Sequence, residues 1–333
     1  MEQRLDDRQR QHTMSGAAHA SAGSSTAGFH SWLRAVARAP TVTPPPTARE
    51  CLGRYSLLRQ IGDGGMGIVY EARDTALDRR VALKVLRSSL TGDREHNERF
   101  MREARTGAAL NHPCIAAVYD VGEHSGRLYI AMEYIDGATL DEHVGIARLT
   151  VDAALEIAFA IAAALQCAHA SRVVHRDLKP LNVMVTRDGG VKLLDFGLAK
   201  RSEDSSASAR VNTPLTETGR IMGSAGYMSP EQVRGRHVDA STDVFAWATI
   251  VYEMLTGALA FPGESGAERV AATLRDEPRE LPRVVAMVGT QLGDLLRRAL
   301  SKEPQERPTS DALVASLHRY RADSLWGRYN RAS

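Results

Sequence analysis

Two kinds of sequence pattern follow one another along the chain, and their order restricts the fold more than any other feature. From Tyr55 to residue 134, short runs rich in Val, Ile, Leu and Tyr are separated by Gly and Asp turns, a pattern typical of antiparallel strands. One charged stretch, 94–110, interrupts them and predicts a helix. Further helices are expected over 151–170, 240–256, 289–300 and 309–320. The order predicts an α+β fold with two lobes, a small antiparallel sheet with one long helix followed by a larger, mainly helical lobe.

The composition agrees with a folded chain of this kind. The 333 residues are 43% hydrophobic and 25% charged, an ordinary globular profile. The formal net charge of +2 offers no overall field for nucleic acid, so no nucleic-acid partner is expected. Three widely spaced cysteines without a C-x-x-C pattern indicate neither a disulfide framework nor a cysteine metal site. We therefore expect a cytoplasmic location.

Residues 1–53 differ from the rest of the chain. They are rich in Ala, Ser, Arg and Pro, which cannot bury enough apolar surface to offset the entropy of ordering, so a flexible tail is expected. A short docking helix over 29–38 is an alternative. The first ten residues lack the pattern of a secretory signal. The longest apolar run, 151–170, is rich in Ala and contains Glu156, so it predicts a buried core helix and no membrane span.

The stretch "IGDGGMGIVY" contains glycines in a G-x-G-x-x-G spacing. In a dinucleotide-binding fold this pattern lies between a strand and a helix. Here Ile68, Val69 and Tyr70 follow the last glycine and continue as a strand, which favours a β-hairpin. Its glycines would let backbone amides approach phosphate oxygens without a Cβ in the way.

Lys84 and Glu103 form a candidate pair. Lys84 lies in the strand "VALK", where alternation places it on the same face as Ala82. Glu103 lies nineteen residues later on the charged helix and could hold Lys84 toward the phosphates of a nucleotide. Two simpler interpretations stay open, because a lone strand lysine is usually a surface residue, and Arg99 could pair with Glu103 along a solvated helix face.

The stretch "HRDLKPLN", 175–182, and Asp195 after the apolar strand "VKLL" bring together the groups that phosphoryl transfer requires. Asn182 and Asp195 offer hard oxygen ligands suited to Mg²⁺. Asp177 can accept the proton of an attacking hydroxyl, and Lys179 can neutralise developing charge. A solvated turn is the alternative interpretation of so many charged residues.

These motifs, taken in order with "SPE" at 229–231 and "RP" at 307–308, resemble the signature set of a eukaryotic-type bacterial serine/threonine protein kinase. The stretches "IGDGGMGIVYEARD", "YMSPEQVRG" and "VYEMLTG" carry the closest resemblance. It implies an N-lobe over 54–132, a hinge over 133–137 and a C-lobe over 138–318, which together form the kinase domain 54–318. A short basic tail, 319–333, would follow.

The resemblance also assigns roles. Asp177, Lys179, Lys84 and Glu103 would be catalytic, and Asn182 and Asp195 would bind metal. His175 would belong to the core, and Glu231 and Arg307 would form a buried ion pair. Met132 would be the gatekeeper, with hinge backbone groups from Glu133 and Ile135. The implied nucleotide-binding residues are Ile61, Gly62, Asp63, Gly64, Gly65, Met66, Gly67, Ile68, Val69, Ala82, Lys84, Met132, Glu133, Ile135 and Met184. Several of these would be plain core residues without the resemblance.

The segment 198–230 is long and rich in Ser and Thr, as functional or disordered loops are. Thr216 and Thr218 are similar to the autophosphorylation pair of bacterial relatives, and a phosphate there could order the loop through Arg176. Unmodified, solvent-facing threonines are the alternative. Ser224, where Thr is usual, would keep a regulatory hydroxyl near Asp177.

The implied activity is transfer of the γ-phosphate of ATP to Ser and Thr hydroxyls of proteins, including the chain itself. ATP and Mg²⁺ are the expected cofactors, and Mn²⁺ is an alternative metal. Two departures from the family pattern stand out: Gly107 replaces a larger residue, which suggests a loosely held helix, and "STDVFAWA" lacks the usual Arg and Gly around Asp243. A catalytically silent scaffold and a small-molecule kinase of related fold are the alternative functions.

Overall fold

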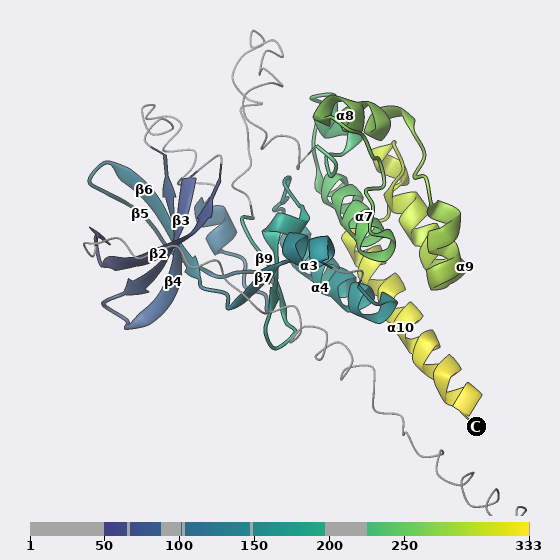
Figure 1. The fold of residues 1–333 in the computed structure, drawn as a ribbon, viewed down its shortest axis with the longest axis horizontal. Coiled ribbons are helices and arrows are strands. Elements are labelled where there is room, and N and C mark those ends of the chain that lie inside the picture. The colour runs from purple at the N-terminus through teal and green to yellow at the C-terminus, as the bar shows by residue number, and fades with distance from the viewer. Residues whose placement is uncertain are drawn as a thin grey trace, which may run out of the picture.

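The computed structural model describes residues 50–64, 67–87, 101, 104–146, 149–196 and 225–332, with side chains up to Arg321. Two lobes are visible, a sheet formed by the first part of the chain and a group of helices formed by the second (Figure 1). This architecture confirms the predicted α+β order of a β-rich lobe followed by a helical lobe.

The first lobe is built on a six-stranded antiparallel sheet with the order β1-β2-β3-β4-β6-β5. Its strands are β1 (Cys51–Leu52), β2 (Tyr55–Asp63), β3 (Gly67–Asp74), β4 (Arg79–Leu86), β5 (Val118–His124) and β6 (Arg127–Glu133). Cys51 and Leu52 pair with Ser56 and Tyr55. The sheet thus begins inside the segment that the sequence predicted to be a flexible tail.

The hairpin of β5 and β6 has a two-residue turn. Its connecting residues are Ser125 and Gly126, with φ of 51° and 74°. Positive φ at both positions matches the right-handed twist of the flanking strands. Gly122 lies within β5, where a Cβ would meet the hydroxyl of Tyr129 at 2.6 Å.

The predicted helix 94–110 is described only at residue 101 and over 104–108, which are helical. A Cβ at Gly107 would lie 2.8 Å from the carbonyl oxygen of Phe196. The missing side chain therefore lets this helix approach the backbone next to Asp195. The expectation of a loosely held helix overlooked this close contact.

A second, three-stranded antiparallel sheet in the order β7-β8-β9 lies where the lobes meet (Figure 1). Its strands are β7 (Gly137–Thr139), β8 (Val183–Thr186) and β9 (Val191–Leu193), and α3 (Leu140–Ile146) follows β7 directly. Residues 134–136 join β6 to β7, inside the predicted hinge. The segment before β8 carries Asp177, Lys179 and Asn182, and the loop after β9 carries Asp195.

The helical lobe packs around α4 (Val151–Ala170) and α7 (Ala240–Thr256). Trp247 on α7 is fully buried and donates a hydrogen bond from its indole nitrogen to Ala158 O (2.8 Å). α4 is long and apolar enough to cross a membrane by length and composition, but half of its most apolar window is buried inside the protein. It is the core helix that the sequence predicted.

The remaining helices of the lobe differ in part from the prediction. They are α6 (Pro230–Val233), α8 (Gly266–Arg275), α9 (Leu281–Ala299), α10 (Ser310–Ala332) and the 3-10 turns η2 (Pro180–Asn182) and η3 (Pro304–Glu306). α9 begins before the predicted residue 289, and Gly289 interrupts it with φ of 80°. α10 continues to Ala332, through the segment predicted to be a tail.

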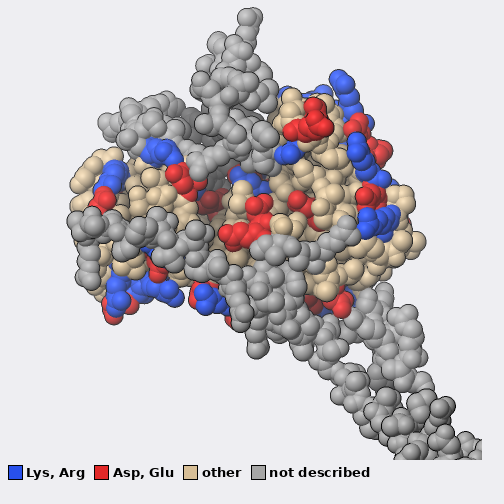
Figure 2. Space-filling model, viewed as in Figure 1, with Lys and Arg blue, Asp and Glu red and all other residues tan. Residues whose placement is uncertain are grey.

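Charged side chains of both signs are interspersed over the face shown in Figure 2. This distribution accords with the near balance of 42 basic and 40 acidic residues. Acidic side chains are visible between the two lobes in this view (Figure 2). The position is relevant because the candidate site lies there.

Candidate active site between the lobes

The glycine-rich stretch forms the hairpin between β2 and β3. Gly62 pairs with Val69 and Asp63 with Ile68, and Gly64 and Gly67 exchange two backbone hydrogen bonds (2.8 and 3.3 Å). The dinucleotide-fold alternative is therefore wrong, because no helix follows the glycines. A Cβ at Gly67 would collide with the backbone of Val85, so this glycine is required by the packing of β3 on β4.

Three of the implied nucleotide-binding residues lie on the neighbouring strands β3, β4 and β6. Ala82 on β4 and Met132 on β6 are register partners, and both are buried beside the half-buried Val69. The Glu133 N–H donates to Ala117 O (2.8 Å), so its carbonyl is the backbone group it could offer to a nucleotide. The other predicted nucleotide residues lie at the hairpin (Ile61, Gly62, Asp63, Gly64, Gly67, Ile68), on the linker (Ile135) and on β8 (Met184).

Lys84 and Asp195 meet across the lobes, although 111 residues separate them. The Lys84 ammonium lies 2.8 Å from Asp195 Oδ2, with side chains 9% and 28% exposed. Burial alone would raise the pKa of Asp195, but the charge and hydrogen bond of Lys84 outweigh it and hold the pKa below its usual range. The surface interpretation of Lys84 is therefore wrong, and Asp195 presents an ionised carboxylate between the lobes.

Three polar side chains of the catalytic loop, 175–182, lie in contact with one another. Lys179 Nζ lies 2.8 Å from Asp177 Oδ2. Asn182 Nδ2 donates to Asp177 O (2.7 Å) and to Asp177 Oδ2 (3.3 Å). Pro180 begins the turn η2, which brings Asn182 back toward Asp177. The sequence cluster is thus a hydrogen-bonded site and not a solvated turn.

A buried carboxylate on α7 holds this loop. Asp243 is fully buried and accepts hydrogen bonds from the backbone N–H of His175 (2.7 Å) and of Arg176 (2.8 Å). His169 Nε2 lies 2.9 Å from the same carboxylate. The sequence indicates Asp243 only through its neighbours and does not predict this role. The available signal was an aspartate in the first turn of a largely apolar helix.

His175 is part of the core, as predicted. Its ring is fully buried, packs on the ring of Phe196 at a centroid distance of 4.7 Å, and has Nε2 2.9 Å from Leu194 O. These contacts tie the catalytic loop to the segment that carries Asp195.

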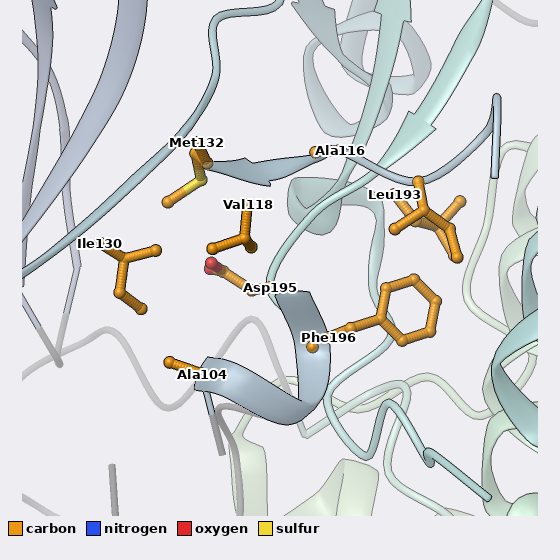
Figure 3. Close-up of a pocket in the computed structure, with 10 residues that line it drawn as sticks. Ala104, Ala116, Val118, Ile130, Met132, Leu193, Asp195 and Phe196 are labelled. Carbon is orange, nitrogen blue, oxygen red and sulfur yellow. The ribbon is translucent and has the colours of Figure 1, made fainter. Parts of the chain in front are cut away.

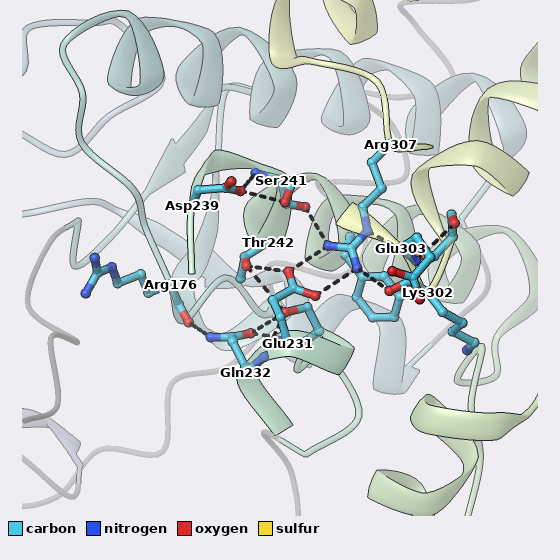
Figure 4. Close-up of polar contacts among 12 residues, drawn as sticks. Arg176, Glu231, Gln232, Asp239, Ser241, Thr242, Lys302, Glu303 and Arg307 are labelled. Carbon is cyan, nitrogen blue, oxygen red and sulfur yellow. Dashed lines mark hydrogen bonds and ion pairs between the residues drawn. The ribbon is translucent and has the colours of Figure 1, made fainter. Parts of the chain in front are cut away.

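The predicted ion pair of the helical lobe is present (Figure 4). Arg307 contacts both carboxylate oxygens of Glu231, at 2.7 and 2.8 Å. Thr242 donates to Glu231 at 2.6 Å. Burial would raise the pKa of Glu231, but the hydrogen bonds from Arg307 and Thr242 lower it to about 2. The pair fixes α6 against α7 and the loop before α10.

Lys302 lies near this pair with its ammonium 3.6 Å from the ring centroid of Phe261, and its Nζ has no hydrogen-bond partner among the described residues. Burial lowers the pKa of Lys302 from 10.5 to about 8, against the attraction of Glu277 and Asp276. The folded state therefore disfavours the charged form.

We expect Lys302→Met to be more stable than wild type at pH 7, by about 1 kcal/mol, because methionine keeps the apolar contact without a buried charge. Between pH 8 and 10.5 the unfolded chain binds the proton that the folded chain has lost, so wild type gains stability as the pH rises. The advantage of the variant should shrink across that range. Urea unfolding at pH 7 and pH 10 measures both effects. Lys192→Met is the control, because it breaks a pair with Glu133 and should therefore give no gain in stability. A variant less stable than wild type at pH 7 contradicts this expectation.

Among the described residues, two cavities adjoin the site. The smaller, of about 20 Å³, is lined by Met132, Val118, Phe196 and Asp195 among others (Figure 3). A larger one, of about 190 Å³, lies beside the catalytic loop and is lined by Lys179, Leu181 and Tyr227 among others. The larger cavity reaches the catalytic loop at Lys179, whose ammonium contacts Asp177.

The donors around Asp177 fit a divalent cation. Asn182 uses its amide nitrogen toward Asp177, so its oxygen is the atom that could bind a metal. Leu194 N donates to Asn182 O (2.9 Å), which holds the residue before Asp195 next to Asn182. Two hard oxygen donors suit Mg²⁺, which completes its coordination with phosphate oxygens and water and rarely takes an all-protein cage.

Several predicted site residues lie outside the described residues. They are Gly65, Met66, Glu103, Thr216, Thr218 and Ser224. The partner of Lys84 on the charged helix and the phosphorylation sites therefore stay predictions. Arg176 is described, and Figure 4 shows its side chain pointing away from Glu231 and Arg307.

Comparison with known proteins agrees with this geometry. Residues 55–319 match the family described as "Protein kinase domain". A probable serine/threonine-protein kinase of Streptomyces coelicolor is 41% identical over 265 residues, which cover 78% of this chain and 38% of the relative. Serine/threonine-protein kinase PrkC of Bacillus subtilis is 38% identical over 267 residues, which cover 80% and 40%.

A solved structure, the PknI kinase domain of Mycobacterium tuberculosis, is 29% identical, with a TM-score of 0.63 over 83% of this chain and 99% of that chain. The chain spans about two fifths of the length of the curated relatives above. The family match, these identities and the site between the lobes lead to one conclusion: this chain belongs to the protein kinase domain family.

Proposed function

We propose that this chain is a bacterial serine/threonine protein kinase that transfers the γ-phosphate of ATP to Ser and Thr hydroxyls of proteins. These include hydroxyls of its own segment 198–230, which is called the activation segment below. The observation that carries the proposal is the cluster of Asp177, Lys179 and Asn182 beside the Lys84–Asp195 ion pair. A scaffold without activity has no physical need for these groups together. A cytoplasmic location is part of the proposal, and the free thiols of Cys114 and Cys167 support it.

Each group has a role that follows from its position. Asp177 accepts the proton of the attacking hydroxyl. Lys179, 2.8 Å from that carboxylate, neutralises charge on the transferred group. Lys84 orients the nucleotide phosphates, and the hairpin of β2 and β3 covers them. Asn182 and Asp195 would hold Mg²⁺, or alternatively Mn²⁺, which when bound supplies positive charge to the phosphate oxygens.

The acceptor protein needs a place beside Asp177. The cavity of about 190 Å³ lined by Lys179, Leu181 and Tyr227 supports binding of an extended polypeptide there. This position favours protein substrates over small molecules.

Lys84→Met tests the proposal. With labelled ATP and Mg²⁺, wild type should label itself and a general acceptor such as myelin basic protein on Ser and Thr, and EDTA should abolish the labelling. The variant should be slower by about a hundredfold, because a positive charge aimed at the phosphates is lost in a shielded site. Lys302→Met, which removes a lysine packed on Phe261 in the helical lobe, should keep its rate. Wild type that labels nothing would leave the scaffold alternative.

A further inference from the structure

The peptide unit between Arg176 and Asp177 is held at both ends by side chains. The Arg176 carbonyl accepts a hydrogen bond from Gln232 Nε2 (2.6 Å). The Asp177 N–H donates to His175 Nδ1 (3.3 Å). Because a peptide unit is planar, restraints on its carbonyl and on its N–H together fix the orientation of the plane. That orientation sets the direction in which the Asp177 side chain leaves the loop.

The restraint opposes backbone strain. Arg176 has φ of 69°, a left-handed conformation that is unfavourable for a residue with a Cβ. Asp243 fixes its N–H (2.8 Å), and Gln232 fixes its carbonyl. Loss of the donor on the carbonyl side would let the plane rotate toward a relaxed conformation.

Gln232 is itself held in place on α6. Its Oε1 accepts from Ser229 N (3.0 Å), and the buried Ser229 hydroxyl accepts from Gln232 N (3.4 Å), which forms a capping box. The neighbouring Glu231 is fixed by Arg307. The backbone N–H of Ser229 needs an acceptor and the carbonyl of Arg176 needs a donor. The side-chain amide of Gln232 can therefore take one orientation only.

We propose that Gln232 is a positioning residue for Asp177: its amide nitrogen holds the Arg176 carbonyl and so aims the carboxylate that accepts the hydroxyl proton. The proposal rests on the proposed kinase activity. It connects α6, at the end of the activation segment, with the catalytic loop through one hydrogen bond between residues 56 positions apart.

Gln232→Glu is the main test, because it keeps the size and the Oε1 acceptor and replaces the donor with an oxygen that faces the Arg176 carbonyl. We expect kcat for labelling of myelin basic protein to fall by about tenfold, since a half-buried acceptor loses its partner. KM for ATP should stay within about twofold, because Lys84 and the hairpin are untouched. Gln232→Met, which adds no charge, should also lower kcat.

Gln166→Glu is the matched control, because the Gln166 amide donates to Asp311 on α10 (2.7 Å) and not to the loop. It should keep kcat even if its melting temperature falls. Hydrogen exchange of the peptide 175–182 without ATP gives a second readout, and it should be faster in Gln232→Glu than in wild type and Gln166→Glu.

Unchanged kcat and exchange in both Gln232 variants would overturn the proposal. A wild type without activity would reject the proposed function instead, while the exchange experiment would still decide whether Gln232 orders the loop.

Discussion

Phosphoryl transfer by an Asp177→Asn variant should be about a thousandfold slower than in wild type, since loss of a positioned base costs two to four orders of magnitude. The amide cannot accept the hydroxyl proton, and Lys179 loses the carboxylate that lies 2.8 Å away. ATP affinity should change little, because Lys84 and the hairpin remain. The melting temperature should also change little, because the Asp177 side chain is 41% exposed.

Initial rates with labelled ATP and equilibrium binding of a fluorescent nucleotide measure the two quantities separately. Asp294→Asn is the matched control, because Asp294 is 59% exposed and pairs with Arg297 on α9. Its rate should equal that of wild type. An Asp177→Asn protein that labels as fast as wild type would remove Asp177 from the mechanism.

The largest effect on stability is expected for Arg307→Met. The free energy of unfolding should fall by about 3–5 kcal/mol, because Glu231 would be left as a buried charge without its partner. Both partners are at most 4% exposed, so water cannot replace the lost contact. For a domain of this size the melting temperature should fall by about 10 °C. Chemical denaturation at pH 7 measures the difference.

Lowering the pH should reduce the difference in the free energy of unfolding between wild type and Arg307→Met. The pKa of Glu231 is about 2 against an ordinary 4.5, so the pair contributes its full stability above pH 4.5 and loses it as the pH falls toward 2. In Arg307→Met, burial raises the pKa of Glu231. The side chain therefore takes up a proton at low pH, and the cost of its unpaired buried charge disappears.

Arg187→Met is the control for the ion pair, because Arg187 and Asp136 are 64% and 50% exposed. It should change stability by less than about 1 kcal/mol. Equal losses of unfolding free energy in Arg307→Met and Arg187→Met would contradict a larger contribution of the buried ion pair.

The sequence predicted best what depends on short spacing. Pro180 and Asn182 follow Asp177 within five residues, so the catalytic loop could be inferred from local chemistry. The strand residues after Gly67 distinguished a hairpin from a dinucleotide fold. Lys84 and Asp195 are distant in the sequence, and their meeting was inferred from the order of family motifs and not from any local pattern.

The features that the sequence analysis missed depend on tertiary contacts. Asp243 and Gln232 act on a loop more than fifty residues away, and neither lies in a stretch whose pattern indicates that partner. Cys51 and Leu52 become a strand only because β2 folds beside them. The predicted helix 289–300 begins too late, because Gly289 interrupts α9 and the helical pattern of the sequence indicates only the part after this break.

The burial of Asp243 beneath the catalytic loop also limits how the protein can be switched off. Local melting of residues 175–176 would leave a carboxylate in the helical core without its two amide donors, at a cost comparable to a large part of the stability of a typical domain. An inactive state that keeps the helical lobe folded must therefore keep this loop in place. Control of activity should act through the parts that approach the loop, and the loop itself remains a fixed platform in both states.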